Sequence, residues 1–450
     1  MSDYNAVIAL AAFIGTIVVW NVLVKRNIGE SMFVGFVASA LFAGTDFFSA
    51  LWVGFMDGLM NEVTYAALAF VVVGELLVRV GIVQRIVDVL SSMIGRFRGG
   101  SIYAATFGSA MFGAVAHNGA ATAATVGSIT IPWIKRSNAS GETASTVLGG
   151  NAGIGAVFPF SGAFFLLLAA PTVVGDLSSD DVILTAFVAA LWFLASRVVA
   201  AFVMIRKRSV GAMDAADIQP LRRTVKVGWS SFIVLIAIAI PILATNGPSG
   251  EAVTGRIGAE AADTIPVLFW LPAAMLVPGL IVGRRLLPKS GRQWWNFLGE
   301  VSPKLGLVAA TMISAFSASE VISNLGLGEQ LAPILEQLDG IPTVIAAIIV
   351  GILVIVIAGP LSTTGTLAAV GGVGYAALTA VGVAPVAAYS ALLIWGASES
   401  ASPPGAAPLY VAAGIADVNP AKTFKPVIMY YLIPTFALGV LVAVGIAWVP

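Results

Sequence analysis

The 450-residue chain is 58% hydrophobic and only 10% charged, and its mean hydropathy is +0.97. Soluble domains carry roughly 25% charged residues, so this composition excludes water as the main solvent. The formal net charge is zero, which removes any argument for nucleic-acid binding, and the absence of cysteine excludes disulfides, thiolate metal sites and cysteine nucleophiles. The single histidine, His117, cannot form a zinc or haem site alone.

The apolar runs are continuous and long enough to cross a bilayer, which takes about 20 residues in a helix. They lack the alternation of membrane-spanning strands, so helices satisfy the backbone instead. The sequence therefore predicts an all-α polytopic membrane protein. The first run, residues 6–24, has no preceding basic segment and no small-residue cleavage site, so we expect a retained membrane helix rather than a signal peptide.

The placement of charged residues predicts the topology, because basic loops face the cytoplasm. Basic residues gather in the loops 206–226 and 284–292, whereas the loop 251–263 between them is more acidic. Tracing backwards from these loops, both ends of the apolar segment 101–134 lie on the cytoplasmic side. This segment is therefore expected to be a re-entrant hairpin or a pair of short helices.

The chain contains an internal repeat. The run Gly74–Gly81 resembles Ser319–Gly326, and nearly the same offset places Pro159 on Pro403. The region 84–100 is basic and its counterpart 325–340 is acidic, so we expect the two copies to have opposite orientations. Inverted repeats of this kind place transport sites near the bilayer midplane. The alternative is an ancestral duplication kept only for packing.

The repeat divides the chain into four expected regions. Scaffold helices occupy residues 1–63, and the first inverted repeat occupies 64–205 with its hairpin at 101–134. Connecting scaffold helices follow at 206–304. The second inverted repeat occupies 305–450, and its hairpin is expected at 341–380.

Four clusters of glycine, proline and small polar residues interrupt the apolar runs, at 116–122, 149–162, 359–366 and 396–405. Glycine and proline disfavour helix, and unwound backbone at membrane depth is tolerated where it lines a cavity. Freed carbonyls suit a cation, and helix N-termini suit a carboxylate. The alternative is that the small residues serve close packing and the hydroxyls bond to their own helices. The candidate substrate contacts in these clusters are His117, Asn118, Asn151, Ser161, Ser362, Thr363, Thr364 and Glu399.

Two ionisable residues, His117 and Glu399, allow more than one interpretation, and a further two are expected to pair. His117 is either a proton relay or a neutral residue bonded to a neighbouring helix. Glu399 either lines the cavity or pairs with a distant cation. Glu75 and Arg79 lie four residues apart, so we expect them to form an ion pair. The sequence shows no recognisable catalytic arrangement and no phosphate-binding loop.

Several motifs resemble the large membrane subunit of TRAP transporters (DctM type). They are the run from Gly74 to Asp88 with Gly95–Gly100, the segment Gly127–Pro132, and the C-terminal segments Ser402–Pro404 and Leu409–Ile415. The resemblance covers nearly the whole chain. It implies an elevator-type secondary transporter of the ion transporter superfamily that takes up a small organic acid with sodium across the inner membrane. It also implies two partners, a small membrane subunit and an extracytoplasmic solute-binding protein.

The resemblance also implies which residues bind the coupling ion. The family usually has a Ser-Gly-Ser tip followed by an Asp, whereas Ala116, His117, Asn118 and Thr122 stand here, and Gly365 replaces the acidic residue of the second hairpin. This departure makes H⁺ the alternative to Na⁺ as the coupling ion. The implied ion-binding positions are Gly119, Gly155, Phe158, Pro159, Ser400, Ser402 and Gly405.

Two rival functions follow from the same residues. A stand-alone carrier of the same superfamily would need neither partner protein. A polytopic membrane enzyme would use His117 and Glu399 on a lipid substrate, although no recognisable motif joins these two residues. We expect a transporter that works in contact with the lipid bilayer and is not an enzyme.

Overall fold

The computed structural model describes residues 4–214, 218–245, 252, 254–256, 258, 267–327, 329–330, 333, 336–338, 340–359, 361–403 and 406–450. All regular secondary structure in these residues is helical, which confirms the predicted all-α class. Two irregular stretches occur in the N-terminal part. A π-helix extends the end of α1, and Gly44, with φ 63° and ψ −120°, makes a kink between α2 and α3. The N-terminal elements are α1 (Asn5–Val18), η1 (Val19–Leu23), α2 (Ile28–Ala40), η2 (Leu41–Asp46), α3 (Phe47–Met60), α4 (Glu62–Arg79) and α5 (Ile82–Ile94).

The first repeat contains the predicted hairpin. Helices α6 and α7 pack against each other and are joined by two residues, so the expected hairpin at 101–134 is present with slightly wider bounds. A broken helix and one long helix follow. The elements are α6 (Gly100–Ala116), α7 (Gly119–Arg136), α8 (Gly141–Asn151), α9 (Ile154–Val157), α10 (Gly162–Leu168) and α11 (Ser179–Lys207).

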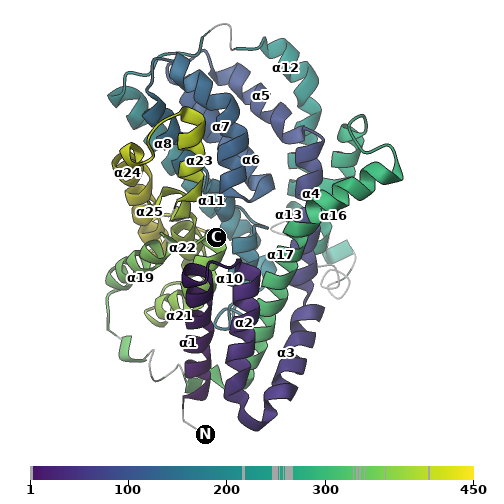
Figure 1. Ribbon diagram of the computed structural model, residues 1–450, viewed down its shortest axis with the longest axis vertical. Coiled ribbons are helices and arrows are strands. Elements are labelled where there is room, and N and C mark those ends of the chain that lie inside the picture. The colour runs from purple at the N-terminus through teal and green to yellow at the C-terminus, as the bar shows by residue number, and fades with distance from the viewer. Residues whose placement is uncertain are drawn as a thin grey trace.

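The connecting region leads into the longest described helix, α17, which has 34 residues and packs against α2, α3 and α4. Figure 1 shows α17 running through the lower half of the molecule beside these three helices. α17 continues through the expected boundary at residue 304, so the four-region division remains a prediction. The elements are α12 (Leu221–Gly228), η4 (Trp229–Ser231), α13 (Phe232–Thr245), α16 (Val267–Gly283), α17 (Gly291–Asn324) and η5 (Glu336–Leu338).

The second repeat mirrors the first in its order of elements. A hairpin of α19 and α20–α21 corresponds to the predicted 341–380, and a broken helix follows it. The elements are α19 (Thr343–Ala358), α20 (Thr363–Thr366), η6 (Leu367–Gly371), α21 (Gly372–Ala380), α22 (Pro385–Gly396), η7 (Ala397–Ala401), α23 (Ala407–Ala416), α24 (Ala421–Val427), η8 (Ile428–Leu432) and α25 (Ile433–Ala443).

The helix boundaries show that the two copies share one register. α7 starts at Gly119 and α20 starts at Thr363, so both begin at the same position of the repeat. The next helices, α8 at Gly141 and α22 at Pro385, keep the same offset. The two copies interlock, because α23 packs against α7 and α8, and α22 packs against α9 and α11. In Figure 1, α23 stands beside α7 and α8.

Among the described residues, four stretches are long and apolar enough to cross a membrane: Ile28–Met60, Ser179–Lys207, Gly291–Asn324 and Ala421–Ala443. Two further helix pairs qualify if each bent pair counts as one span. One of them, Gly141–Val157 with Gly162–Leu168, is bent by 44°. This bent pair is the broken helix of the first repeat, and it brings irregular backbone into the interior of the bundle.

Candidate functional site

The tip of the first hairpin is a two-residue turn. His117 ends α6 in the left-handed region with φ 48°, and Asn118 is extended and begins α7. The Asn118 side chain accepts a hydrogen bond of 2.8 Å from the Ala121 N–H, which is the usual way to cap a helix N-terminus. Asn118 is therefore fixed by capping, and its amide nitrogen remains directed away from that bond.

The first broken helix is interrupted for an identifiable reason. Phe158 precedes Pro159 and is extended, as the residue before a proline tends to be. Phe160 then has φ 70°, and Ser161 caps α10 by accepting a 3.0 Å bond from the Phe164 N–H. The Phe160 ring stacks on Phe70 of α4 with 4.3 Å between the ring centroids. This stack forms an apolar part of the wall between the broken helix and α4.

The tip of the second hairpin is held by a carboxylate. One carboxylate oxygen of Glu399 accepts bonds of 2.8 Å from both the backbone N–H and the hydroxyl of Thr363. Ser362 caps the same turn by accepting a 3.1 Å bond from the Gly365 N–H. Of the two interpretations of Glu399, the structure supports the one in which it lines the cavity, where it bonds to a helix start of its own repeat.

The two broken segments meet directly. The Ser400 hydroxyl accepts a 3.0 Å bond from the Gly153 N–H, which joins the second repeat to the first. A Cβ atom at Gly153 would lie only 2.3 Å from the Ala397 carbonyl oxygen. Gly153 is therefore required for this approach, because any side chain would push the two repeats apart.

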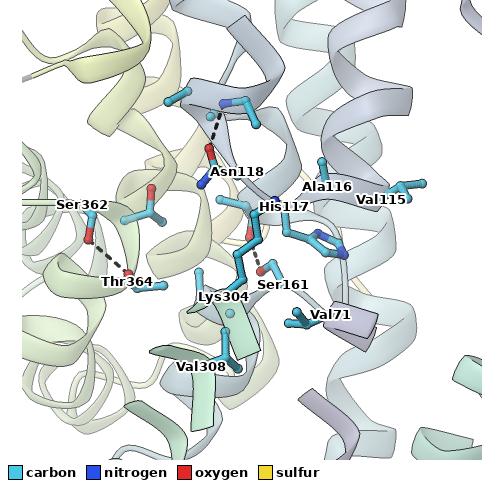
Figure 2. Close-up of a pocket in the computed structure, with 18 of the residues that line it drawn as sticks. Val71, Val115, Ala116, His117, Asn118, Ser161, Lys304, Val308, Ser362 and Thr364 are labelled. Atoms are coloured by element: carbon cyan, nitrogen blue, oxygen red, sulfur yellow. Dashed lines mark hydrogen bonds between the residues drawn. The ribbon is translucent and has the colours of Figure 1, made fainter. Parts of the chain in front are cut away.

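A cavity of about 480 Å³ lies where the two tips and the two broken segments converge. Figure 2 shows Asn118 and His117 entering it from one side and Ser362 and Thr364 from another. The structure thus brings together most of the predicted site. The predicted residues that line the cavity are His117, Asn118, Gly119, Ser161, Ser362, Thr363, Thr364, Glu399 and Ser400.

The remaining predicted positions do not line this cavity. Asn151 is buried behind it and donates a 3.0 Å bond to Thr106, and Ser402 donates a 2.8 Å bond to the Ser398 carbonyl of its own segment. Gly155, Phe158 and Pro159 also lie off its lining. The Gly155 carbonyl faces Nδ1 of His117 at 3.3 Å. Gly405 lies outside the described residues.

Sequence reasoning missed one charged pair in the cavity wall. The expected Glu75–Arg79 pair is wrong, because both residues pair instead with α17: Glu75 with the ammonium group of Lys304, and Arg79 with Glu300 at 2.5 Å. The helical spacing suggested a local pair, but α17 packs along α4 and offers both residues a partner. Glu75 and Lys304 line the cavity. The signal for Lys304 was its isolation in the largely apolar stretch after Val301.

The cavity wall offers both hydrogen-bonding groups and charged groups. The wall combines hydroxyls, an amide, a helix start and both signs of charge. No group of three or more His, Asp or Glu residues that could hold a metal ion occurs within the described part of the chain. Two inverted repeats, re-entrant hairpins and a shared polar cavity together define an integral membrane transporter.

The family of this transporter follows from its sequence profile. The profile described as "Tripartite ATP-independent periplasmic transporter, DctM component" matches residues 7–448, and the chain belongs to this family. No curated protein sequence matches the chain.

Solved structures confirm the fold. The chain is similar to Neisseria gonorrhoeae MtrF, from a class of antimetabolite efflux pumps, with a TM-score of 0.65 and 14% identity over 90% of this chain and 84% of that one. It is also similar to the Alcanivorax borkumensis YdaH transporter, with a TM-score of 0.61 and 15% identity over 89% of this chain and 88% of that one.

Proposed function

We propose that this chain is the large permease subunit of a TRAP transporter that takes up a small organic acid by symport with a cation. The observation that supports the proposal most directly is the convergence of both hairpin tips and both broken segments on one cavity. The start of α7 at Gly119 faces this cavity, and a helix N-terminus favours a negatively charged group. The cavity is large enough for a small carboxylate.

Sodium is the proposed coupling ion, and the proton is its alternative. Unwound backbone at 152–153 and 158–161 offers carbonyl oxygens of the kind that hard cations prefer. The imidazole of His117, however, faces the Gly155 carbonyl that the family resemblance assigns to an ion. A titratable ring at this position is the feature that favours the proton as the alternative.

The proposed assembly contains two partners, a small membrane subunit and an extracytoplasmic solute-binding protein, in the inner membrane. The tripartite character of the family supports this proposal. The bilayer is the solvent of the complex, and large exposed side chains such as Trp52, Ile349 and Val356 suit contact with lipid. The hairpins and broken helices are proposed to move together past the static α17, in an elevator manner.

Reconstitution tests the function directly. The chain is placed in proteoliposomes with a small membrane subunit and a solute-binding protein of the same family system, and uptake of labelled small carboxylates is measured under an inward sodium gradient, an inward proton gradient or neither. Sodium-driven uptake is the expected result. Uptake driven only by protons would replace the proposed ion, and uptake indifferent to both gradients would overturn the coupling.

The same experiment separates the rival functions. Strong uptake by the chain alone, without either partner, would favour the stand-alone carrier. Chemical conversion of a lipid that is abolished in His117→Ala would favour the membrane enzyme. Neither rival has a specific observation in its favour, so the TRAP assignment stands as the proposal.

A further inference from the structure

The charged side chains in the cavity wall differ in the partners that they already have. Three charged side chains other than His117 line it among the described residues: the acids Glu75 and Glu399 and the cation Lys304. Glu399 already accepts two hydrogen bonds from Thr363. Lys304 is therefore the group of the wall whose charge is complementary to a carboxylate.

Lys304 is poised to change partners. Its ammonium group pairs with Glu75, yet its side chain is 56% exposed and that of Glu75 is 25% exposed. Neither side chain is fully enclosed by protein and both line the cavity, so a carboxylate entering the cavity can reach the ammonium group and compete with Glu75 for it. In Figure 2 the Lys304 side chain extends into the cavity, which Asn118 and Ser161 also line.

A second ion pair connects the same two helices, so the Glu75–Lys304 pair is not the sole charged link between α4 and α17 among the described residues. Arg79 of α4 and Glu300 of α17 pair at 2.5 Å, one helical turn from Glu75 and Lys304, with the two charges exchanged between the helices. Neither Arg79 nor Glu300 lines the cavity. We call Arg79–Glu300 the outer pair and Glu75–Lys304 the inner pair. Because the outer pair already connects α4 to α17, the feature that sets the inner pair apart is its place in the cavity wall.

We infer that Lys304 is a specificity-determining residue, which leaves Glu75 and binds the carboxylate of the transported solute. This inference rests on the proposed uptake of an organic acid. Glu75 keeps the ammonium group paired when the cavity is empty, and it competes with the solute for Lys304. Lys304 and Glu75 belong to α17 and α4 rather than to the hairpins, so the solute contacts a fixed charge as well as the tips.

The test uses the full reconstituted complex and a labelled panel of acetate, succinate and gluconate, with the corresponding uncharged amides as competitors. For the carboxylate that the wild-type complex takes up, Lys304→Met is expected to raise the KM by about tenfold or more, since a charge-assisted bond is lost. Glu75→Gln is expected to lower the KM, because the competing carboxylate is gone. Lys304→Arg retains the charge and is expected to retain preference for the acid over its amide.

The outer pair provides the matched control. Arg79→Met and Glu300→Gln remove an ion pair between the same helices and are expected to leave the KM unchanged. If Lys304→Met fails to fold, the double variant Glu75→Gln/Lys304→Met leaves no unpaired charge and is expected to show the same loss of preference for the acid. A carboxylate KM unchanged in Lys304→Met, or changed equally in Arg79→Met, would overturn the inference. Absence of carboxylate uptake by the wild-type complex would instead overturn the proposed function.

Discussion

A single glycine decides whether the broken helix of the first repeat can approach the first hairpin. Gly155 packs against Gly113, and a Cβ atom at Gly155 would lie 2.3 Å from the Gly113 carbonyl oxygen. Since the contact is with backbone, no side-chain rotation relieves it. The broken helix of the first repeat therefore lies against the first hairpin only because position 155 has no side chain.

Gly155→Ala is accordingly expected to lower the free energy of unfolding by about 1–3 kcal/mol, the usual cost of overpacking. Thermal unfolding of the purified protein in detergent measures the change. Gly414→Ala in α23 is the matched control, because a Cβ atom there meets nothing within 4 Å. Equal melting temperatures for the two variants would contradict the prediction.

His117→Asn separates the two coupling ions. Asparagine tolerates the positive φ of position 117 better than most residues, so the turn is expected to persist while the titratable ring is removed. Under the proposed sodium coupling, uptake by the variant still depends on the sodium gradient. Loss of all gradient dependence in His117→Asn, with the folded protein intact, would support the proton instead.

At the scale of elements, the two copies of the repeat begin their second hairpin helix with the same kind of N-cap. Asn118 and Ser362 occupy the same position of the two copies, and each accepts a hydrogen bond from the N–H three residues later. An N-cap is defined by local sequence, so each tip carries the signal for its own helix start within a few residues. The caps fix the direction in which each hairpin returns from the cavity.

Variants of Asn118 test this capping separately from charge. Asn118→Ala removes the acceptor and is expected to cost about 1 kcal/mol of stability. Asn118→Asp keeps the acceptor and is expected to retain stability while placing a negative charge in the cavity and weakening carboxylate uptake. Melting temperature and uptake KM, measured together, distinguish the two effects. A destabilised Asn118→Asp would argue against capping as the role of Asn118.

The hairpins and their breaks could be predicted from the sequence because they depend on local signals. Proline at 159, the glycines of 149–155 and the basic loops all act within a few residues of their own position. The hydrogen bond from Gly153 to Ser400 and the pairing of Lys304 with Glu75 could not be predicted in this way. They depend on how distant helices pack, and a nearer partner, Arg79, gave the wrong expectation for Glu75.

At the scale of the whole molecule, a buried arginine connects the end of the first repeat to the end of the second. Arg197 of α11 is fully buried, and its guanidinium donates a 3.1 Å bond to the Tyr431 carbonyl and a 2.9 Å bond to the Thr435 hydroxyl. The Tyr431 carbonyl belongs to the π-helical turn η8. Arg197 thus holds α11 against η8 and α25 through neutral acceptors.

Thr435→Val is expected to destabilise the protein by about 1–3 kcal/mol, because it leaves a buried charged donor without its acceptor. Thr379→Val is the control, since the Thr379 hydroxyl bonds only to carbonyls of its own helix. Chemical or thermal unfolding in detergent compares the two. A Thr435→Val protein as stable as Thr379→Val would show that Arg197 does not depend on this acceptor.

The length of α17 has a practical consequence. Its 34 residues correspond to about 51 Å at 1.5 Å per residue, well beyond a hydrocarbon core of about 30 Å, so α17 reaches past both edges of the core or lies tilted within it. In the proposed elevator motion, α17 is the static reference against which movement of the hairpins can be measured. Because the chain has no cysteine of its own, Gly306→Cys on α17 and Ser128→Cys on α7 would carry a spectroscopic pair without any prior replacement. The distance between the two labels would then report how far the first hairpin travels during a transport cycle.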